Sequence, residues 1–399
     1  MSPDVVIVGG GIIGACAALE LARAGLAVTV VEKTAVGLGS TAASSACIRQ
    51  GFGRAEAIEL ARDGLLAWEA WREHAEVPAA EPAARFSRTG VLYLGEDQEK
   101  LRREAELMAS RGARAELWGA NALRGRYADW ELAGIHAALW EPEGGWVEGP
   151  DLAARNAMDA ACARGAVLVV DRVVAVEVTG GRVSGVTLAR AGRLPCGAVL
   201  NAAGPWSAGV NAMAGVALPL RALRHRTALL PVEGGSSDLP IVADFAAETY
   251  FRPEPGRAAI LVGSFDEIND AEPEDDADHA DPGVDRAYYE AKALLVAARM
   301  PERVRLPPWT RGVAGLYDVH EPDWYPVIGP TTLDGFFIAA GTSGAWFKGG
   351  PSIAVLIRHV VTRASGPVLL PRTGTRLDAR FFRCDRAPIT TPFAGGVVG

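Results

Sequence analysis

Three glycines near the start of the chain have a spacing that suits phosphate binding. Gly9, Gly11 and Gly14 follow an apolar run at residues 4–8 and precede an alanine-rich, helix-like stretch at 12–24. The run predicts a buried parallel strand. In this pattern the first glycine permits a tight turn, the second lets the backbone approach a pyrophosphate, and the third lets the helix pack on the sheet. The unpaired N–H groups at the start of the helix would attract the phosphates.

A second strand, expected at 27–31, ends at Glu32, 18 residues after Gly14. Strand, helix, strand and acid together are the full context of a dinucleotide-binding fingerprint. Glu32 would accept hydrogen bonds from an adenosine ribose, and its charge disfavours a 2′-phosphate and therefore NADP. The alternative is a glycine-rich turn in an ordinary α/β protein. This segment alone does not separate NAD from FAD.

A second strand, glycine-rich loop and helix are expected near the end of the chain. Residues 335–340 are apolar, the loop that follows contains Phe347 and Lys348, and Pro351 opens a helix that continues to residue 361. Proline suits the first turn of a helix. The start of this helix is a second candidate anion site. The alternative is a plain packing turn between strand and helix, which would have the same sequence pattern.

Four segments, in order along nearly the whole chain, resemble the D-amino-acid oxidase superfamily of FAD-dependent oxidoreductases. They resemble most its sarcosine oxidase-like and glycine oxidase-like members, and they are residues 5–33, 39–53, 199–215 and 315–357. The resemblance implies FAD as cofactor and oxidation of an amine or amino acid to an imine. The substrate hydride would pass to flavin N5, with the protein supplying orientation and electrostatics.

The resemblance also implies where the cofactor binds. The expected FAD-binding residues are Gly9, Gly11, Ile12, Ile13, Gly14, Glu32, Lys33, Ser40, Thr41, Ser44, Ser45, Val173, Ala203, Gly204, Trp206, Gly315, Gly341, Gly344, Ala345, Trp346, Phe347 and Lys348. Gly315 stands where monomeric sarcosine oxidases have the cysteine that attaches FAD, so we expect non-covalent binding. Leu261 stands where they keep a lysine that speeds the reaction with oxygen, which argues against fast oxygen use.

Five residues are expected on the substrate side. Arg49 and Lys348 match the cations that hold the substrate carboxylate in relatives resembling sarcosine oxidase, and charge pairing would offset the cost of burying that carboxylate. A surface arginine and a lysine that snorkels from a loop are the alternative. Tyr250 and Tyr317 match pocket positions, with core tyrosines as the alternative. His225 and Arg226 are neighbours on a strand, so one faces the pocket and the other faces away.

The expected fold class is α/β: a Rossmann-like FAD-binding domain with a doubly wound parallel sheet, and an inserted α+β substrate domain with a mixed sheet. We assign residues 1–85, 150–215 and 325–399 to the first domain, and 86–149 and 216–324 to the second. In the second domain, strands are expected at 88–94, 136–141, 224–233, 247–252, 258–264 and 311–317, and a helix at 97–111. Residues 266–285 hold ten Asp/Glu and no Lys/Arg, which predicts a solvated loop or, alternatively, an acidic docking site for a redox partner.

Composition excludes several other classes of protein. The net charge is −8 and no Lys/Arg run forms a basic face, so we expect no nucleic-acid partner. Five widely separated cysteines suit reduced thiols in a reducing, cytoplasmic setting. Six scattered histidines give no metal-binding spacing, so we expect no metal site. No uncharged run suits a membrane helix. The expected partners are a small amine or amino acid and oxygen or another electron acceptor; the oligomeric state is left open. A flavin dehydrogenase for a 2-hydroxy acid or polyol phosphate remains an alternative, as does a non-catalytic flavin-binding assembly protein.

Overall fold

A parallel sheet is built from strands that lie far apart in the sequence. The computed structural model describes residues 2–266, 270–305 and 311–390. The sheet order is β20-β21-β13-β1-β2-β9, and only the edge pair β20–β21 is antiparallel. Its strands are β1 (Val5–Val8), β2 (Val28–Glu32), β9 (Val167–Val170), β13 (Ala198–Asn201), β20 (Val327–Pro330) and β21 (Phe336–Ala340). Every strand of this sheet comes from the segments assigned above to the FAD-binding domain, although the domain boundaries stay a prediction.

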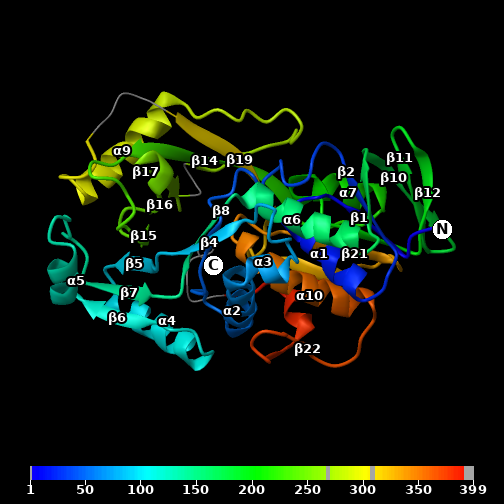
Figure 1. Ribbon diagram of the computed structural model, residues 1–399, viewed down its shortest axis with the longest axis horizontal. Coiled ribbons are helices and arrows are strands. Elements are labelled where there is room, and N and C mark those ends of the chain that lie inside the picture. Colours follow the sequence, from blue (N-terminus) through cyan, green and yellow to red (C-terminus); the bar gives the residue numbers. More distant parts are fainter. Residues whose placement is uncertain (1, 267–269, 306–310, 391–399) are drawn as a thin grey trace.

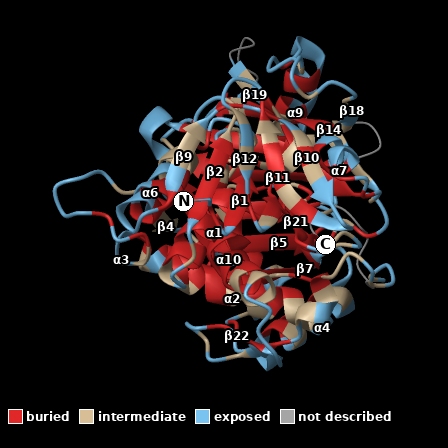
Figure 2. Ribbon diagram, turned by 90° about the vertical axis from the view of Figure 1, so that its right-hand side faces the viewer, coloured by how far each residue is buried: buried red, intermediate tan, exposed pale blue. Residues whose placement is uncertain are grey.

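The two faces of this sheet are covered differently because side chains alternate along a strand. Val5 and Ile7 of β1 belong to the core cluster that includes α1 (Ile12–Arg23), α6 (Pro150–Ala163) and α10 (Gly350–Val361). Val6 and Val8 belong to a separate cluster on the opposite face. That face is covered by an antiparallel sheet and a short helix: β10 (Val173–Thr179), β11 (Arg182–Leu188), β12 (Gly192–Pro195) and α7 (Ser207–Met213). Figure 2 shows these layers around the buried strands β1 and β2.

A mixed sheet, as expected for the second domain, occupies the other half of the molecule (Figure 1). Its order is β18-β14-β17-β16-β15-β5-β7-β6, with β19 also pairing with β14. The strands are β5 (Val91–Gly95), β6 (Glu116–Gly119), β7 (Ala137–Glu141), β14 (Leu220–Pro231), β15 (Ile241–Asp244), β16 (Thr249–Glu254), β17 (Ala259–Ser264), β18 (Glu272–Pro273) and β19 (Arg311–His320). The long strands β14 and β19 run toward the parallel sheet and carry site residues to it.

The other described helices surround these sheets. They include α2 (Ala55–Glu69), α3 (Trp71–His74), α4 (Gln98–Ser110), α5 (Ala120–Arg126) and α9 (Arg286–Arg299), together with the short 3-10 turns η1 (Gly204–Trp206) and η3 (Phe347–Gly349). Helix α4 buries Leu101, Ala105 and Met108, as the sequence periodicity predicts. Helix α9 was not predicted.

Two predictions for the second domain need correction. The strand expected at 88–94 is confirmed as β5 from Val91 onward, but its start is not. The chain turns at Gly90 (φ 74°), and Arg88 ends a strand of another sheet, β4 (Arg85–Arg88). Strand β4 pairs with β8 (Gly145–Glu148), which also pairs with β3 (Cys47–Ile48). Residues 267–269 of the acidic segment lie outside the described residues. The rest of the segment is not only a solvated loop, because β18 pairs with β14 and Asp285 caps the first turn of α9.

Candidate functional site

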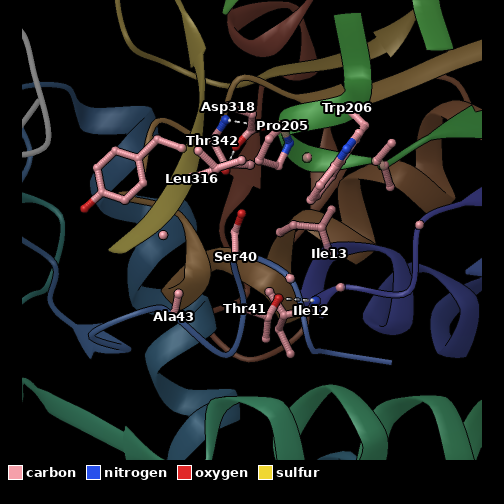
Figure 3. A pocket seen from close by; sticks show the side chains of 18 of the residues that line it. Ile12, Ile13, Ser40, Thr41, Ala43, Pro205, Trp206, Leu316, Asp318 and Thr342 are labelled. Atoms are coloured by element: carbon pink, nitrogen blue, oxygen red, sulfur yellow. Dashed lines mark hydrogen bonds between the residues drawn. The ribbon is translucent and has the colours of Figure 1, made fainter. Parts of the chain in front are cut away.

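A cavity of about 570 Å³ opens at the carboxyl ends of β1 and β2 (Figure 3). Ligands of open α/β sheets bind at this edge. Most predicted cofactor residues line the cavity: Gly9, Gly11, Ile12, Ile13, Glu32, Lys33, Ser40, Thr41, Ser44, Ser45, Val173, Ala203, Gly204, Trp206, Gly315, Gly344, Trp346 and Phe347. Gly14 and Gly341 are not among its lining residues, and Ala345 and Lys348 line a neighbouring cavity instead.

The glycine turn leaves no space for side chains at two of its positions. Gly9 has φ 107°, and a Cβ there would lie 2.5 Å from the Ala202 carbonyl oxygen. A Cβ at Gly14 would lie 2.0 Å from the Gly9 carbonyl oxygen, so only glycine lets α1 pack this closely on the strand. Gly11 begins the helix, and the N–H of Ile12 donates to Thr41 Oγ1 over 3.1 Å, as Figure 3 shows.

Glu32 turns back toward the glycine turn from the end of β2. Its Oε2 accepts from the Gly10 N–H at 2.8 Å, and its Oε1 accepts from the Thr34 N–H at 2.9 Å. These bonds orient the carboxylate at the edge of the cavity, where it could meet a ribose. We call this part of the cavity, with Glu32, Lys33, Arg172 and Trp206, the nucleotide end.

Two buried polar atoms of the cavity wall have no partner among the described residues. They are Ser40 Oγ and His225 Nε2. A buried polar atom without a hydrogen bond is costly, so each calls for a ligand or water. Together with the glycine turn and the helix start, they fit a bound dinucleotide.

A smaller cavity of about 50 Å³ lies against the larger one, and Arg49 and Lys348 line it. Both cations lie against one ring, with Arg49 Cζ 4.5 Å and Lys348 Nζ 5.5 Å from the centre of Phe52. Lys348 is 4% exposed, and burial first, then the nearby Arg49, hold its pKa well below the usual value. Its ammonium group contacts the Ala345 carbonyl oxygen. Neither residue is a surface cation, so the surface alternative is wrong.

Tyrosines and a histidine stand where the two cavities meet. Tyr250 and Tyr317 line both cavities and share a hydrogen bond. Burial raises the pKa of Tyr250 to about 12 and that of Tyr317 well above its usual value. His225 stacks on Tyr317 with ring centres 3.9 Å apart, and burial lowers its pKa to about 4. This boundary, with Arg49 and Lys348, is called the reacting end.

Strand alternation is resolved for the neighbours His225 and Arg226. His225 lines the large cavity. Arg226 points elsewhere and pairs with Asp285 at 2.8 Å and Glu272 at 3.2 Å. Arg226 therefore adds no cation to the cavity.

Two departures from sarcosine oxidases can be placed in the structure. A Cβ at Gly315 would lie 2.6 Å from Ala43 Cβ, so the chain has no room for a side chain at the expected attachment position. Leu261 is 9% exposed and lies directly opposite Arg252 on β16. The Arg252 guanidinium is held by Glu254 at 2.8 Å and lies 4.1 Å from the Trp146 ring centre.

The sequence reasoning missed two buried carboxylates that hold the site in place. Asp318 accepts from the Thr342 N–H at 3.1 Å and from its hydroxyl, and so fixes the last glycine loop (Figure 3). Glu141 accepts from the Gln50 N–H at 2.7 Å and from the Tyr93 hydroxyl at 2.9 Å beside the small cavity. Burial raises the pKa of both carboxyls. An acid at the end of an apolar strand, as in 136–141, was the available signal.

The parallel sheet, glycine turn and cavity define a dinucleotide-binding α/β protein. Residues 4–359 match the family model of the FAD-dependent oxidoreductases (DAO), and the chain belongs to this family. FAD is the cofactor of the family.

Relatives of the chain include proteins from bacteria and animals. Sarcosine oxidase subunit beta of Rhizobium meliloti (strain 1021) is 28% identical, over 96% of this chain and 88% of its own length. FAD-dependent oxidoreductase domain-containing protein 1 of Xenopus laevis is 26% identical, over 90% and 79%. Among solved structures, L-proline dehydrogenase from P. horikoshii has a TM-score of 0.81 at 24% identity, covering 96% of this chain and 97% of its own. Its likeness supports the fold.

No helix of the described part of the chain is long and apolar enough to cross a membrane. Within the same residues, no group of three or more His, Cys, Asp or Glu side chains could hold a metal ion.

Proposed function

We propose that this chain oxidises a small amine that carries a carboxylate, most simply an amino acid, with FAD held non-covalently in the large cavity. The observation that carries this proposal is the pair of buried cations, Arg49 and Lys348, in a small cavity that adjoins the large one. Both cations border one small cavity, so a carboxylate bound there would accept charge-assisted hydrogen bonds from them. Its charge would also raise the depressed pKa of Lys348 toward the charged form.

Each part of the reacting end then has a separate task. Arg49 and Lys348 would fix the carboxylate, which orients the substrate toward the larger cavity. Tyr250 and Tyr317 would separate the reacting bond from water and offer hydroxyl groups, which remain protonated because their pKa values are raised. His225 would face the cofactor cavity as a neutral imidazole. When bound, FAD supplies the chemistry by accepting the hydride from the substrate carbon.

Non-covalent binding is supported by the lack of space at Gly315. At the nucleotide end, the helix start at Ile12 would hold the pyrophosphate and Glu32 the ribose. The proposal for the electron acceptor depends on Leu261, which stands where sarcosine oxidases keep the lysine that speeds reaction with oxygen. Without that lysine, we expect the reduced flavin to pass its electrons to an acceptor other than oxygen.

The test is an anaerobic screen of flavin reduction. N-methylated, cyclic, D- and L-amino acids are mixed with the purified holoprotein, and the flavin absorbance is followed. At least one should bleach the flavin, and should do so far more slowly with Lys348→Ala. Bleaching only by 2-hydroxy acids or polyol phosphates would replace the proposal with the dehydrogenase alternative. FAD binding without bleaching by any substrate would favour the assembly protein.

The acceptor is tested on the reduced protein. Re-oxidation by air is compared with re-oxidation by a quinone or dye. Slow air oxidation with fast dye turnover supports a dehydrogenase, and fast air oxidation contradicts the argument from Leu261.

A further inference from the structure

One aspartate of the acidic segment contacts three residues of the cavity wall. Asp278 contacts the ammonium group of Lys33 and accepts from Arg172 Nη1 at 2.6 Å and from Trp206 Nε1 at 2.9 Å. These three residues line the nucleotide end, beside Glu32. Lys33 also lies over the Trp206 ring, 3.3 Å from its centre. One carboxylate therefore joins three parts of the cavity wall.

The segment that carries Asp278 is anchored on both sides. Before it, the Glu274 N–H donates to the Ala222 carbonyl oxygen at 3.0 Å, next to the pairing of β18 with β14. After it, the buried Arg224 donates to the carbonyl oxygens of Asp281 at 2.8 Å and Gly283 at 2.6 Å. The turn between these anchors is thus held at both of its ends by the mixed sheet.

The tip of the turn is ordered by its own hydrogen bonds. Asp276 Oδ1 accepts from the Asp278 N–H at 3.1 Å, and its carbonyl oxygen accepts from the His279 N–H at 3.0 Å. The side chain of Asp278 is 28% exposed, and Lys33 first, then Arg172, lower its pKa to about 2. Asp278 is therefore charged throughout the physiological range.

We infer that Asp278 is a positioning residue for the cofactor: it holds Lys33 and Trp206 across the nucleotide end and so slows the release of FAD. The inference rests on the cofactor site of the proposed function. The proposed function holds FAD non-covalently, with no room for the expected attachment at Gly315, so contacts alone would retain the cofactor. A wall fixed from the second half of the molecule raises the barrier to release, because Asp278 must separate from its partners before the wall can open.

The experiment compares Asp278→Asn with Asp275→Asn in the holoprotein. Both variants remove one charge from the same turn, but Asp275 is exposed and forms no ion pair among the described residues. FAD release is followed by transfer to an excess of an FAD-binding apoprotein. Partly exposed, charge-assisted contacts of this number predict release roughly 5- to 20-fold faster in Asp278→Asn and unchanged release in Asp275→Asn.

Salt dependence and rescue separate positioning from a general loss of structure. Ionic screening should speed release more in the wild type than in Asp278→Asn, since the variant lacks the screened charge. Asp278→Glu should restore slow release in part. The thermal midpoint of the apoprotein should fall only slightly in Asp278→Asn, because the contacts that it loses are partly exposed.

Equal rates of FAD release from the wild type, Asp278→Asn and Asp275→Asn would overturn the inference. A large fall in the thermal midpoint of the Asp278→Asn apoprotein, with no recovery of slow release in Asp278→Glu, would overturn it too. Neither result depends on a substrate, so failure of the amine screen leaves this test intact. Failure here leaves the proposed function intact.

Discussion

The two ends of the large cavity hold charge in different ways. At the nucleotide end, the glycine turn presents backbone N–H groups, and the charged side chains Glu32, Lys33 and Asp278 are partly exposed. At the reacting end, Arg49, Lys348 and His225 are buried, and burial shifts the pKa of both Lys348 and His225 downward. Partly exposed charges are screened and exchange with water, whereas buried charges require a partner. We therefore expect substitutions at the reacting end to have the larger effects.

The largest effect is expected from removing a buried cation. Lys348→Ala should lower the second-order rate constant of flavin reduction roughly 100- to 1000-fold, because truncating one partner of a buried charge pair costs about 3–4 kcal/mol. Stopped-flow reduction with the best amine of the screen measures it. Arg54→Ala is the matched control, because Arg54 lines neither cavity. A decrease of less than tenfold in this rate constant would contradict the larger effect expected at the reacting end than at the nucleotide end.

A smaller effect is expected at Glu32. Glu32→Ala should weaken FAD binding about tenfold, since it removes the acceptor of the Gly10 N–H and a proposed ribose contact, each a charge-assisted hydrogen bond. Titration of apoprotein with FAD, followed by flavin fluorescence, measures the dissociation constant. Thr34→Val removes only a neighbouring hydroxyl that donates to Glu32, and should change the constant much less. Equal effects of the two substitutions would contradict the assignment.

His225 should make the unfolding free energy of the apoprotein depend on pH. Its folded pKa of about 4 lies below the ordinary 6.5, so between these values the unfolded chain binds a proton that the folded chain does not. Stability is present above pH 6.5 and is lost as the pH falls toward 4. His225→Gln should flatten this slope by up to about 1.4 kcal/mol per pH unit in urea titrations. His279→Gln should not flatten it, because Asp276 raises the pKa of His279; a flatter slope there would contradict the cause.

The smallest effect is expected from adding the missing attachment group. Gly315→Cys should yield no covalent flavin, because Ala43 occupies the space of the new side chain. Acid precipitation followed by an absorbance scan of the pellet measures it. The double variant Gly315→Cys with Ala43→Gly tests the cause, since it clears that space. A yellow pellet from Gly315→Cys alone would contradict the prediction, because it would mean that Ala43 can move aside for the new side chain.

The parts of the site predicted from sequence are those encoded by neighbouring residues. The glycine turn, α1, β2 and Glu32 lie within a short segment, so spacing alone indicates their arrangement. Arg49 and Lys348 were placed together only through the family resemblance, because nothing local relates positions so distant in the chain. Glu141 gave one local signal, its place at the end of an apolar strand, but its partners lie on other segments. Asp318 and Asp278 gave none, since each acts through partners distant in the sequence. The strand predicted at 88–94 is present as β5 (Val91–Gly95), but its start was placed too early, because Gly90 separates it from a strand of another sheet.

The order of strands in the parallel sheet has a consequence for how the polypeptide acquires its structure. Strand β1 pairs with β13, and β13 in turn pairs with β21, so the sheet that begins at Val5 is completed only by residues near Ala340. Contacts of such sequence separation form slowly and leave apolar edges exposed in the meantime. During synthesis β1 can pair with β2 early, but its other edge stays open until β13 and then β21 have left the ribosome. Slow refolding and reliance on chaperones are the expected cost of building one cofactor site from both extremes of the polypeptide.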